Sequence, residues 1–469
     1  MYKLSVLVAL ILILASCGGA SGSGSGGSSG GNGGSVQNTL SIKLLYSDAC
    51  GQSTPASDAA VIIHNPDLSN EKIILANANG EISYTTNDTK KTFSTVFFNN
   101  AGSSGIKPVN VSTYVDQLVM DVGEILHYNK DISSCECQTS DLRVQLPAIS
   151  AGIVSINMSG NHSFADVNND DDGVAHLKGI EYCKKNSGEW PITSVFIETS
   201  DGASYGAIIP DISATSEVTA DLLGDKISIN TNQNFVQSIA KINGVSHFAN
   251  YNTLSSEIVA FTSPLIDFTQ IFSYDYEDIY GIEDVDTAYV FTFSSIDTKT
   301  LNQTFDLLKP QIDYTELAGI LDSPGNYNVQ DQGIFDLVLF RMYAVYRGEL
   351  LLFWTVEAPL SGAALNIENL DIETFISEST LDDLVDYVQI DLAVDGYEGI
   401  NGYADFQKKK ISKNAMPPGF NSDWAYSEYG ALTIQTSTLN FSNLGKAMSA
   451  NALKNVKVKR RVGEALRLH

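Results

Sequence analysis

Short runs in which apolar and polar residues alternate follow one another along most of the chain. Leu40, Ile42 and Leu44 alternate with polar residues, and Ile82 and Tyr84 repeat the pattern further on. A period of two is typical of a strand with one buried face, because successive side chains of a strand point to opposite faces. The chain is therefore predicted to be mainly β, built from two or three β-sandwich-like modules with a few short helices.

Turn signals separate these runs. The apolar run 72–75 leads to Asn79-Gly80, a strong hairpin signal, before alternation resumes. The segment 112–126 fits a helix or a strand, because its apolar spacing is helical but Gly123 interrupts it. Further strands are predicted at 144–146, 153–156, 194–197, 226–229, 288–293, 337–346, 350–356, 388–392 and 432–436, and short helices at 305–308, 315–321 and 381–387.

The predicted organisation has five consecutive parts. No repeat of fixed period is evident, which disfavours a propeller or a solenoid. The parts are a cleaved leader at 1–16, a cysteine with a disordered Gly/Ser tether at 17–36, a β-sandwich module at 37–132, a β-rich middle domain at 133–300 and a β-rich C-terminal domain at 301–469.

The first residues have the order of an export signal. Lys3 precedes an apolar run from Leu4 to Ala15, and the small residue Ser16 stands before Cys17. The run is shorter than the ~20 apolar residues that a membrane-spanning helix needs. Charge, apolar core and small residue in this order predict a leader that is removed on export.

The ending Leu14-Ala15-Ser16-Cys17 resembles the lipobox of bacterial lipoproteins. The resemblance implies that the leader is cut before Cys17 and that the Cys17 thiol carries a diacylglycerol, which would hold the chain to a membrane. Gly18 in place of Asp implies release to the outer membrane, on its periplasmic face or at the cell surface. The alternative is an ordinary secreted protein with a chance cysteine.

The charge of the chain limits its partners. It has 55 Asp and Glu against 28 Lys and Arg, a formal net charge of −27 at pH 7. Such an acidic body repels nucleic acid and anionic lipid, so both are poor partners. It fits a solubility surface, or one that collects divalent cations. The basic end at 454–461 predicts a final edge strand, with docking against the acidic body or an anionic envelope polymer as the alternative.

The stretch PASDAAVIIHN at 55–65, with KIILANANGEISYTT at 72–86, resembles carboxypeptidase-regulatory-like or transthyretin-like domains. The resemblance covers about 50 residues and implies a β-sandwich. Modules of this family are structural or binding units without catalytic residues of their own.

Four cysteines follow Cys17. An even count in an exported chain predicts two disulfides. Cys135 and Cys137 are too close in sequence to pair without strain, so each is expected to bridge to Cys50 or Cys183, and both connectivities remain open. Such bridges would join the first module to the second. A zinc site is the alternative, but the CxxC knuckles typical of zinc sites are missing.

An acidic stretch supplies candidate calcium ligands. Asp166, Asn168, Asp170 and Asp172 offer oxygen ligands at every second position, and Gly173 permits a sharp turn. The resemblance to EF-hand or dockerin loops is partial, because the position of the bidentate Glu holds a glycine. The alternative is a solvated acidic turn, and calcium is the only cofactor that the sequence suggests.

A second acidic stretch is interleaved with tyrosines. Such residues fit sugar binding, with rings stacking on the sugar and carboxylates bonding its hydroxyls, or they line a loop beside a sandwich edge. They are Tyr274, Asp275, Tyr276, Glu277, Asp278, Tyr280, Glu283, Asp284, Asp286 and Tyr289.

No catalytic motif is evident, and none of the six histidines has metal-site spacing. The sequence therefore predicts a non-catalytic envelope lipoprotein that binds a glycan, a protein or another envelope component. The alternatives are a lipid-anchored hydrolase with unrecognised carboxylates in 135–469, and a structural subunit of an envelope assembly.

Overall fold

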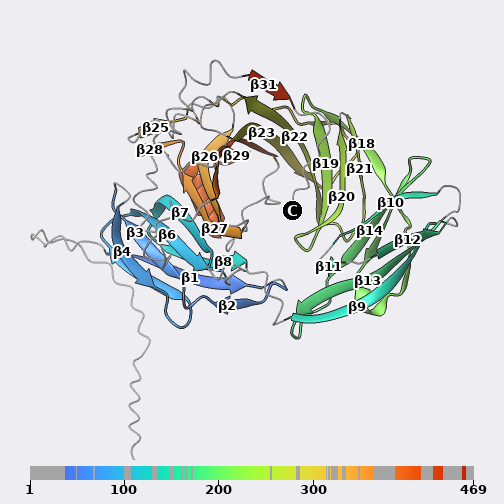
Figure 1. Cartoon of the computed structure of the whole chain (residues 1–469), viewed down its shortest axis with the longest axis horizontal. Helices are drawn as coiled ribbons and strands as arrows, with labels where there is room; N and C mark the ends of the chain where they lie inside the picture. The colour runs from blue at the N-terminus through green and yellow to red at the C-terminus, as the bar shows by residue number, and fades with distance from the viewer. Residues whose placement is uncertain are drawn as a thin grey trace, which may run out of the picture. The chain divides into compact units, whose positions relative to one another are not determined.

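The computed structural model describes residues 37–48, 50–66, 69–99, 107–128, 135–147, 152–159, 162–163, 166–170, 173–253, 256–280, 286–312, 314, 317, 326–329, 334–346, 349–363, 386–412, 426–436 and 457–460. Most of these residues belong to strands, which confirms the predicted mainly β fold (Figure 1). The bounded helices in this part of the chain are α3 (Tyr403–Ser412) and the single turn η1 (Ile212–Ala214). The chain divides into two units, 1–36 and 37–469, and the described residues lie in the second.

The first eight strands form a two-layer sandwich. They are β1 (Asn38–Ser47), β2 (Ser53–Pro55), β3 (Ala60–His64), β4 (Asn70–Leu75), β5 (Glu81–Thr86), β6 (Lys90–Phe98), β7 (Val109–Leu118) and β8 (Asp121–Tyr128). One sheet has the order β2-β1-β5 with β8 beside β1, and β4, β3, β6 and β7 form the other layer. Leu40 and Leu44 of β1 share a core with Val61 and Phe93. Alternation along each strand sends every second apolar side chain into this core.

The Asn79-Gly80 turn is present, but the predicted hairpin is wrong. Strand β4 before it pairs with β3, whereas β5 after it pairs with β1. The turn therefore carries the chain from one layer of the sandwich to the other. The Gly80 carbonyl accepts the Leu44 N–H at 2.8 Å, and a Cβ at Gly80 would lie 2.2 Å from the Leu44 carbonyl oxygen. This close contact with β1 holds the turn away from β4.

The segment 112–126, which fits a helix or a strand by its pattern, forms most of β7 and β8. Gly123 has a φ of 81°, a left-handed conformation that glycine adopts readily. The pairing of β8 with β1 shifts register at this point, between Ser41 and Ile42. The glycine that interrupts the helical pattern thus accommodates an irregularity in a strand.

A second sandwich follows. Its strands are β9 (Cys135–Gln145), β10 (Ile153–Ser159), β11 (His162–Ser163), β12 (Asp166–Asp170), β13 (Val174–Lys185), β14 (Thr193–Thr199), β15 (Ser204–Ile209), β16 (Glu217–Thr219) and β17 (Leu222–Leu223). One sheet has the order β11-β13-β9-β16 with β12 beside β13, and the other has the order β10-β14-β15-β17. Val144, Leu177, Val195 and Ile197 meet in the core between them.

A small three-stranded sheet comes next, made of β18 (Asp225–Asn230), β21 (Glu257–Ala260) and β24 (Phe305–Asp306). The helix predicted at 305–308 is wrong, because Phe305 pairs in parallel with Ile229 of β18. Phe305 and Leu307 are both buried in the core with Ile229. Their spacing of two residues is that of a strand, and burial of both on one side excludes a helical turn.

One long sheet connects the rest. Its order is β20-β19-β22-β23-β30-β29-β26-β27-β7-β6-β3-β4, and β31 pairs beside β22 (Figure 1). The new strands are β19 (Phe235–Ile242), β20 (Val245–Thr253), β22 (Phe268–Tyr280), β23 (Thr287–Thr298), β26 (Phe335–Tyr346), β27 (Glu349–Ala358), β29 (Tyr387–Tyr397), β30 (Tyr426–Thr436) and β31 (Lys457–Arg460). The short strands β25 (Asn326–Asn328) and β28 (Ser361–Ala363) pair with each other.

The long sheet contains strands from all three predicted segments, 37–132, 133–300 and 301–469. Strand β27 pairs in parallel with β7 of the first segment, and β30 pairs with β23 of the second. One core accordingly holds Val111, Val290 and Trp354. Hydrogen bonding of this sheet crosses both predicted boundaries.

Candidate functional site

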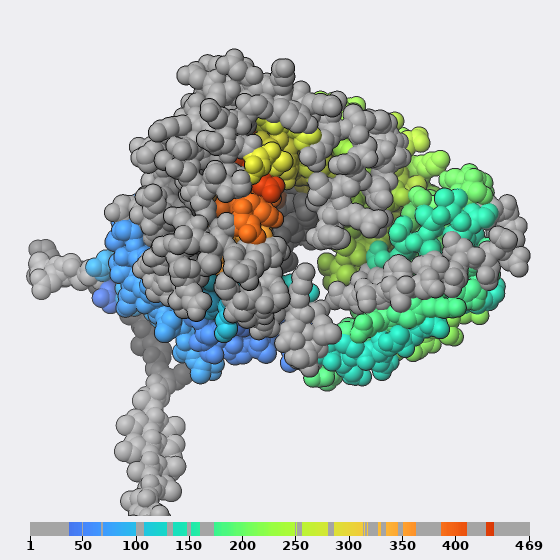
Figure 2. Space-filling view, viewed as in Figure 1, coloured from blue at the N-terminus to red at the C-terminus, as the bar shows by residue number. Residues whose placement is uncertain are grey.

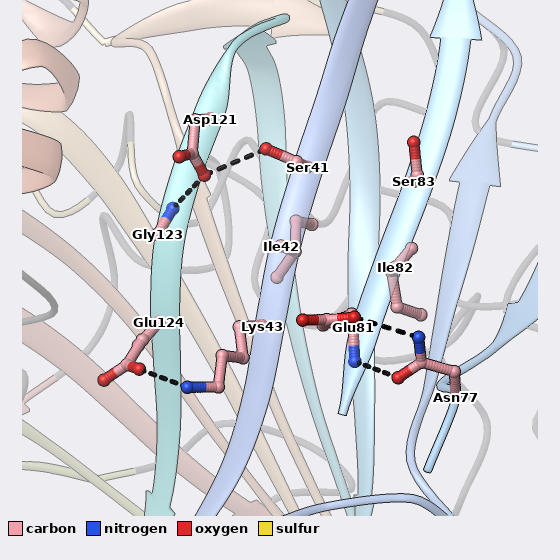
Figure 3. Close-up of a pocket in the computed structure, with 10 residues that line it drawn as sticks. All are labelled: Ser41, Ile42, Lys43, Asn77, Glu81, Ile82, Ser83, Asp121, Gly123 and Glu124. Carbon is pink, nitrogen blue, oxygen red and sulfur yellow. Dashed lines mark hydrogen bonds and ion pairs between the residues drawn. The ribbon is translucent and has the colours of Figure 1, made fainter. Parts of the chain in front are cut away.

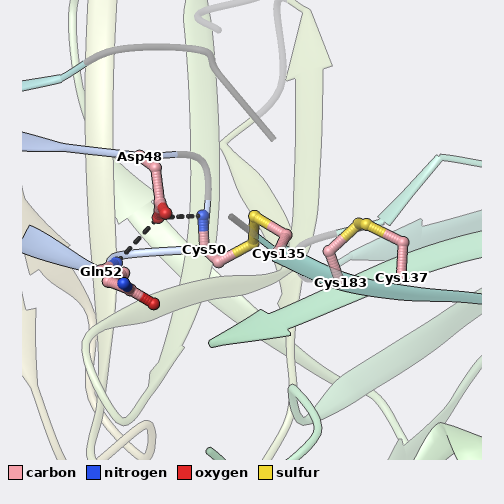
Figure 4. The surroundings of a disulfide bond; sticks show 6 residues. All are labelled: Asp48, Cys50, Gln52, Cys135, Cys137 and Cys183. Carbon is pink, nitrogen blue, oxygen red and sulfur yellow. Dashed lines mark hydrogen bonds between the residues drawn. A yellow bond between two sulfur atoms is a disulfide. The ribbon is translucent and has the colours of Figure 1, made fainter. Parts of the chain in front are cut away.

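Two disulfides confirm the prediction from the cysteine count (Figure 4). Cys50 pairs with Cys135, with Cα atoms 6.0 Å apart, and Cys137 pairs with Cys183, with Cα atoms 4.1 Å apart. The first bridge joins β9 of the second sandwich to the first sandwich. The second does not join modules as expected, because Cys137 and Cys183 are direct partners on β9 and β13 of one sheet.

The cysteines are not a metal centre. Potential ligand atoms of Asp48, Cys50 and Cys135 lie within 4.8 Å of one another, and Glu181 stands similarly beside the second disulfide. Disulfide sulfurs are not thiolates, the form in which cysteine binds metal. The Asp48 carboxylate instead accepts the backbone N–H of Cys50 at 2.9 Å and of Gln52 at 2.8 Å, which fixes the turn that carries Cys50 (Figure 4).

Several predicted site residues lie outside what the structure describes. Cys17 and Asp172 are outside the described residues. Asp166, Asn168 and Asp170 belong to β12, which pairs with β13 up to the partners Asp170 and Val174. The described backbone of this candidate calcium segment is one strand of an antiparallel pair, and calcium binding stays a prediction.

A shallow depression of about 490 Å³ lies on the outer face of β1, β5 and β8 (Figure 3). Its polar side chains bind one another. Lys43 forms an ion pair with Glu124 at 2.7 Å, and the Ser41 hydroxyl donates to Asp121 at 2.9 Å. The Asn77 amide donates to Glu81 at 3.0 Å. Because these groups already satisfy each other, a ligand would gain little by replacing them.

The tyrosines of the second acidic stretch are in strands and not in a loop. Tyr274 and Tyr276 of β22 are 1% and 4% exposed, and the Tyr274 ring stacks on Phe235 at 5.0 Å. The carboxylates between them point to the opposite face, where Asp275 accepts a hydrogen bond from Asn234 at 2.8 Å and lies 3.7 Å from the Lys309 ammonium. These two tyrosines are core residues and present no ring to a sugar. Glu283 and Asp284 are outside the described residues.

A row of polar residues crosses six strands of the long sheet. Each is the direct partner of the next on the neighbouring strand, so their side chains share one face. We call this set the polar row: Tyr289 on β23, Thr433 on β30, Asp391 on β29, Arg341 on β26, Thr355 on β27 and Ser112 on β7. At about 4.8 Å per strand the row spans roughly 24 Å.

Arg341 is the cation of the row, and its guanidinium is largely enclosed. Nη1 donates to the Tyr429 hydroxyl at 3.2 Å, and the guanidinium carbon lies 5.8 Å from the centre of the Tyr429 ring. Among the described residues, no carboxylate lies within ion-pair distance of it. A guanidinium has five N–H donors, so most of them have no described acceptor.

The two carboxylates near Arg341 have other partners. Asp391 accepts hydrogen bonds from the Thr433 hydroxyl at 2.9 Å and the Gln389 amide at 3.1 Å. Asp395 accepts a hydrogen bond from the Tyr397 hydroxyl at 2.5 Å. Burial raises the pKa of Asp391 and raises the pKa of Asp395 to about 7.

Aromatic rings flank the polar row. Tyr343 and Phe353, two pairs further along β26 and β27 and so on the same face, stack at 4.8 Å with planes 28° apart, and both are only partly buried. On the other side, Phe291 lies 5.9 Å from Tyr429. Figure 2 shows small orange and yellow areas of the C-terminal half of the chain at the surface. Within the polar row, Tyr289, Arg341, Thr355 and Ser112 are partly exposed.

Helix α3 covers the neighbouring part of the same face. Tyr403 and Phe406 pack on Leu337 and Leu339 of β26. The Tyr403 hydroxyl donates to the Glu357 carbonyl at 2.9 Å, which ties the helix to β27. The helix packs beside the polar row and not on it.

Asp391 and Asp395 do not have the spacing for glycoside hydrolysis. Asp391 and Asp395 are four residues apart on one strand, a Cα separation of about 13 Å. Retaining and inverting enzymes place their two carboxyl groups about 5 and about 6.5–9.5 Å apart. An Arg, amides, hydroxyls and partly exposed rings are instead groups that recognise a ligand.

The chain matches no known protein family, and no curated protein has a detectably similar sequence. Within the described residues, no helix has the length and apolarity to cross a membrane.

Sequence reasoning missed the polar row. Its members come from strands far apart in the chain, and the register of the sheet brings them together. One signal was present: Arg341 is the only charged residue in the strand segment LVLFRMYAV, where an apolar side chain is expected. Placing a cation at a position where an apolar side chain is expected costs folding free energy unless the charge has a partner.

Proposed function

We propose that this protein is a non-catalytic, lipid-anchored envelope protein that binds a glycan along the polar row of its long sheet. The observation that carries the proposal is the strip itself, in which hydrogen-bonding groups on successive strands lie beside the partly exposed rings of Tyr343 and Phe353. Rings of this kind stack on the apolar faces of sugars, and carboxylates, amides and guanidinium groups bond sugar hydroxyls.

The length of the strip favours an extended ligand. Tyr289, Arg341, Thr355 and Ser112 of the row are partly exposed, whereas Thr433 and Asp391 between them are buried. The exposed members are spread over roughly 24 Å, farther than a single small molecule reaches. The strip lies on strands that are hydrogen-bonded in one continuous sheet. This rigid support lowers the entropic cost of binding.

The anchor is part of the same proposal. A diacylglycerol on Cys17 would hold the binding strip close to the outer membrane, and the Gly/Ser stretch 18–35 would let it reorient. Growing cells with labelled palmitate tests this part. The wild-type protein should take up the label, and the Cys17→Ser variant should not.

A glycan panel tests the binding function. The chain from residue 17 onward with Cys17→Ser would be screened against neutral and acidic polysaccharides. Replacing Tyr343 and Phe353 by Ala should weaken binding at least tenfold. Tyr128→Ala is the matched control, because Tyr128 is 57% exposed on β8 and lies on another sheet. Equal binding by both variants would contradict the proposal.

The same incubation separates the alternatives. A binding protein leaves the polymer intact, so the concentration of reducing ends should stay constant. Release of new reducing ends that is lost in a single Asp or Glu variant would show a hydrolase instead. Binding to no glycan together with stable co-purifying envelope proteins would favour a structural subunit.

A further inference from the structure

The strongest unexplained feature of the polar row is the incomplete hydrogen bonding of Arg341. Its guanidinium lies on the face of β26, where the Tyr429 hydroxyl accepts from Nη1 at 3.2 Å. The remaining N–H groups have no acceptor among the described residues. Arg341 is partly exposed, and none of its nitrogens is among the buried atoms that lack a partner, so these donors are open to a ligand.

The neighbouring carboxylates do not supply that acceptor. Asp391 is the direct cross-strand partner of Arg341, but its Oδ1 atom accepts from Thr433 and Gln389. Asp395 accepts from Tyr397. Each carboxylate is held by neutral donors on its own side, and the guanidinium is left facing the strip.

We propose that the glycan bound by the polar row carries carboxylates, and that Arg341 binds one of them. The inference rests on the proposed glycan binding and names its chemical class. A guanidinium presents two parallel N–H groups that match the two oxygens of a carboxylate, which no neutral sugar hydroxyl reproduces. In a chain of net charge −27, Arg341 is the group of the polar row that can attract an acidic sugar.

A uronic acid within an oligomer fits better than a free small acid. The stacked Tyr343 and Phe353 rings stand two residue pairs from Arg341 along β26 and β27, on the same face. A sugar ring on this aromatic pair would place the carboxylate of an adjoining residue near Arg341. A small carboxylic acid would use the guanidinium and leave the aromatic pair bare.

Isothermal titration with matched ligands tests the inference. The probes are hexamers of galacturonate, glucuronate and mannuronate, the carboxyl-reduced form of each, and free galacturonic acid. The protein is the chain from residue 17 with Cys17→Ser. At least one uronate hexamer should bind tenfold or more tighter than its reduced form and than the free acid.

Variants then assign the preference to Arg341. Arg341→Gln should remove at least tenfold of the affinity for the acidic hexamer and leave the reduced hexamer within twofold. Arg341→Lys should give an intermediate loss, because the ammonium keeps the charge without the planar pair of donors. Arg143→Gln is the control of equal charge change, since Arg143 pairs with Glu217 on the second sandwich. Thermal unfolding checks each fold. If Arg341→Gln does not fold, Tyr429→Phe, which removes the hydroxyl that positions Nη1, should weaken only the acidic hexamer.

The outcomes separate the two proposals. If acidic and reduced hexamers bind equally, or if Arg341→Gln weakens both alike, the carboxylate inference is overturned and glycan binding stands. If free galacturonic acid binds as tightly as the hexamer, the inference that the ligand is an oligomer is overturned. Binding of none of the hexamers and none of the polysaccharide panel overturns both.

Discussion

Arg341 and Asp391 are direct cross-strand partners on β26 and β29, yet no ion pair joins these two described residues. Thr433 and Gln389 hold the Asp391 carboxylate, and Tyr429 holds the guanidinium. A contact ion pair would satisfy both charges and leave nothing for a ligand. Their separation keeps the cation available, and it makes the charge of the site depend on its carboxylates.

Binding of an acidic oligomer should strengthen as the pH falls from 8 to 6. The Asp395 pKa is raised to about 7, chiefly by burial, so Asp395 is ionised at pH 8 and mostly protonated at pH 6. Arg341, Tyr429, Tyr397 and Glu357 are the charged and titratable groups around it; Arg341 stays cationic throughout. The ligand carboxylates also stay ionised in this range. Loss of one nearby negative charge is worth about 1 kcal/mol, roughly fivefold in affinity.

Titration of the galacturonate hexamer at pH 6, 7 and 8 measures this effect. Asp395→Asn should bind more tightly than the wild-type protein at pH 8 and should show a smaller change in affinity between pH 8 and pH 6. The carboxyl-reduced hexamer is the control and should show no trend. An affinity of the wild-type protein that rises with pH would contradict the assignment.

Replacing Asp395 by Asn should stabilise the folded protein at high pH. The folded protein holds the Asp395 proton up to about pH 7, whereas the unfolded chain loses it near 3.8, the ordinary pKa of an aspartate. The folded state therefore binds more protons between these values, and the free energy of unfolding falls as the pH rises through them. Asp395→Asn removes this penalty, which is at most about 4 kcal/mol and is reduced by solvent. The asparagine oxygen can still accept the Tyr397 hydroxyl.

Urea unfolding at pH 8 and pH 4 tests this prediction. Asp395→Asn should raise the free energy of unfolding at pH 8 and change it little at pH 4. Asp405→Asn should do the opposite at pH 8, because hydrogen bonding from the Asn401 backbone lowers the Asp405 pKa. A loss of stability at pH 8 in Asp395→Asn would mean that the ionised carboxylate is favourable where it stands.

The strands were predictable because burial on one face leaves a local signal. Of the nine later strand segments, eight lie within observed strands, and 144–146 extends one residue beyond the end of β9. Which strands pair with each other was not predictable, because the alternation of apolar and polar residues in a strand is the same whichever strand lies beside it. The Asn79-Gly80 turn was readable, but whether β5 returns to β4 or crosses to β1 depends on a contact with Leu44. The helix predicted at 305–308 failed for the same reason: pairing with β18 decides the conformation of Phe305.

The candidate site was even less predictable than the fold. The row that contains Arg341 exists only because β27 pairs with β7, whose partners Thr355 and Ser112 are more than 200 residues apart in sequence. The tyrosines that did attract attention, Tyr274 and Tyr276, are buried by packing with Phe235. The disulfides were easier to predict, because an even number of cysteines in an exported chain already indicates pairing. Only the choice between two connectivities required the structure.

Removing either disulfide should destabilise the protein strongly. The Cys50–Cys135 bridge closes 85 residues of chain and the Cys137–Cys183 bridge closes 46. Restriction of the unfolded chain by loops of these sizes is worth roughly 4 kcal/mol each. Replacing Cys50 and Cys135 by Ser, or Cys137 and Cys183 by Ser, should lower the urea midpoint in both cases. Alkylation of the unfolded, unreduced wild-type protein should label none of the four cysteines, and labelling of any pair would contradict its bridge.

Calcium should stabilise the chelator-treated protein if Asp166, Asn168, Asp170 and Asp172 form a binding loop. A ligand that binds only the folded state adds about 2.7 kcal/mol at a concentration 100 times its Kd. Isothermal titration should give heat for one site, and the melting temperature should rise with calcium but less with magnesium, which demands stricter geometry. Replacing Asp170 and Asp172 by Asn should remove both responses. Asp221→Asn with Asp225→Asn is the control of equal charge change at exposed positions. Absence of heat and of a thermal shift in the wild-type protein would show that the acidic turn is only solvated.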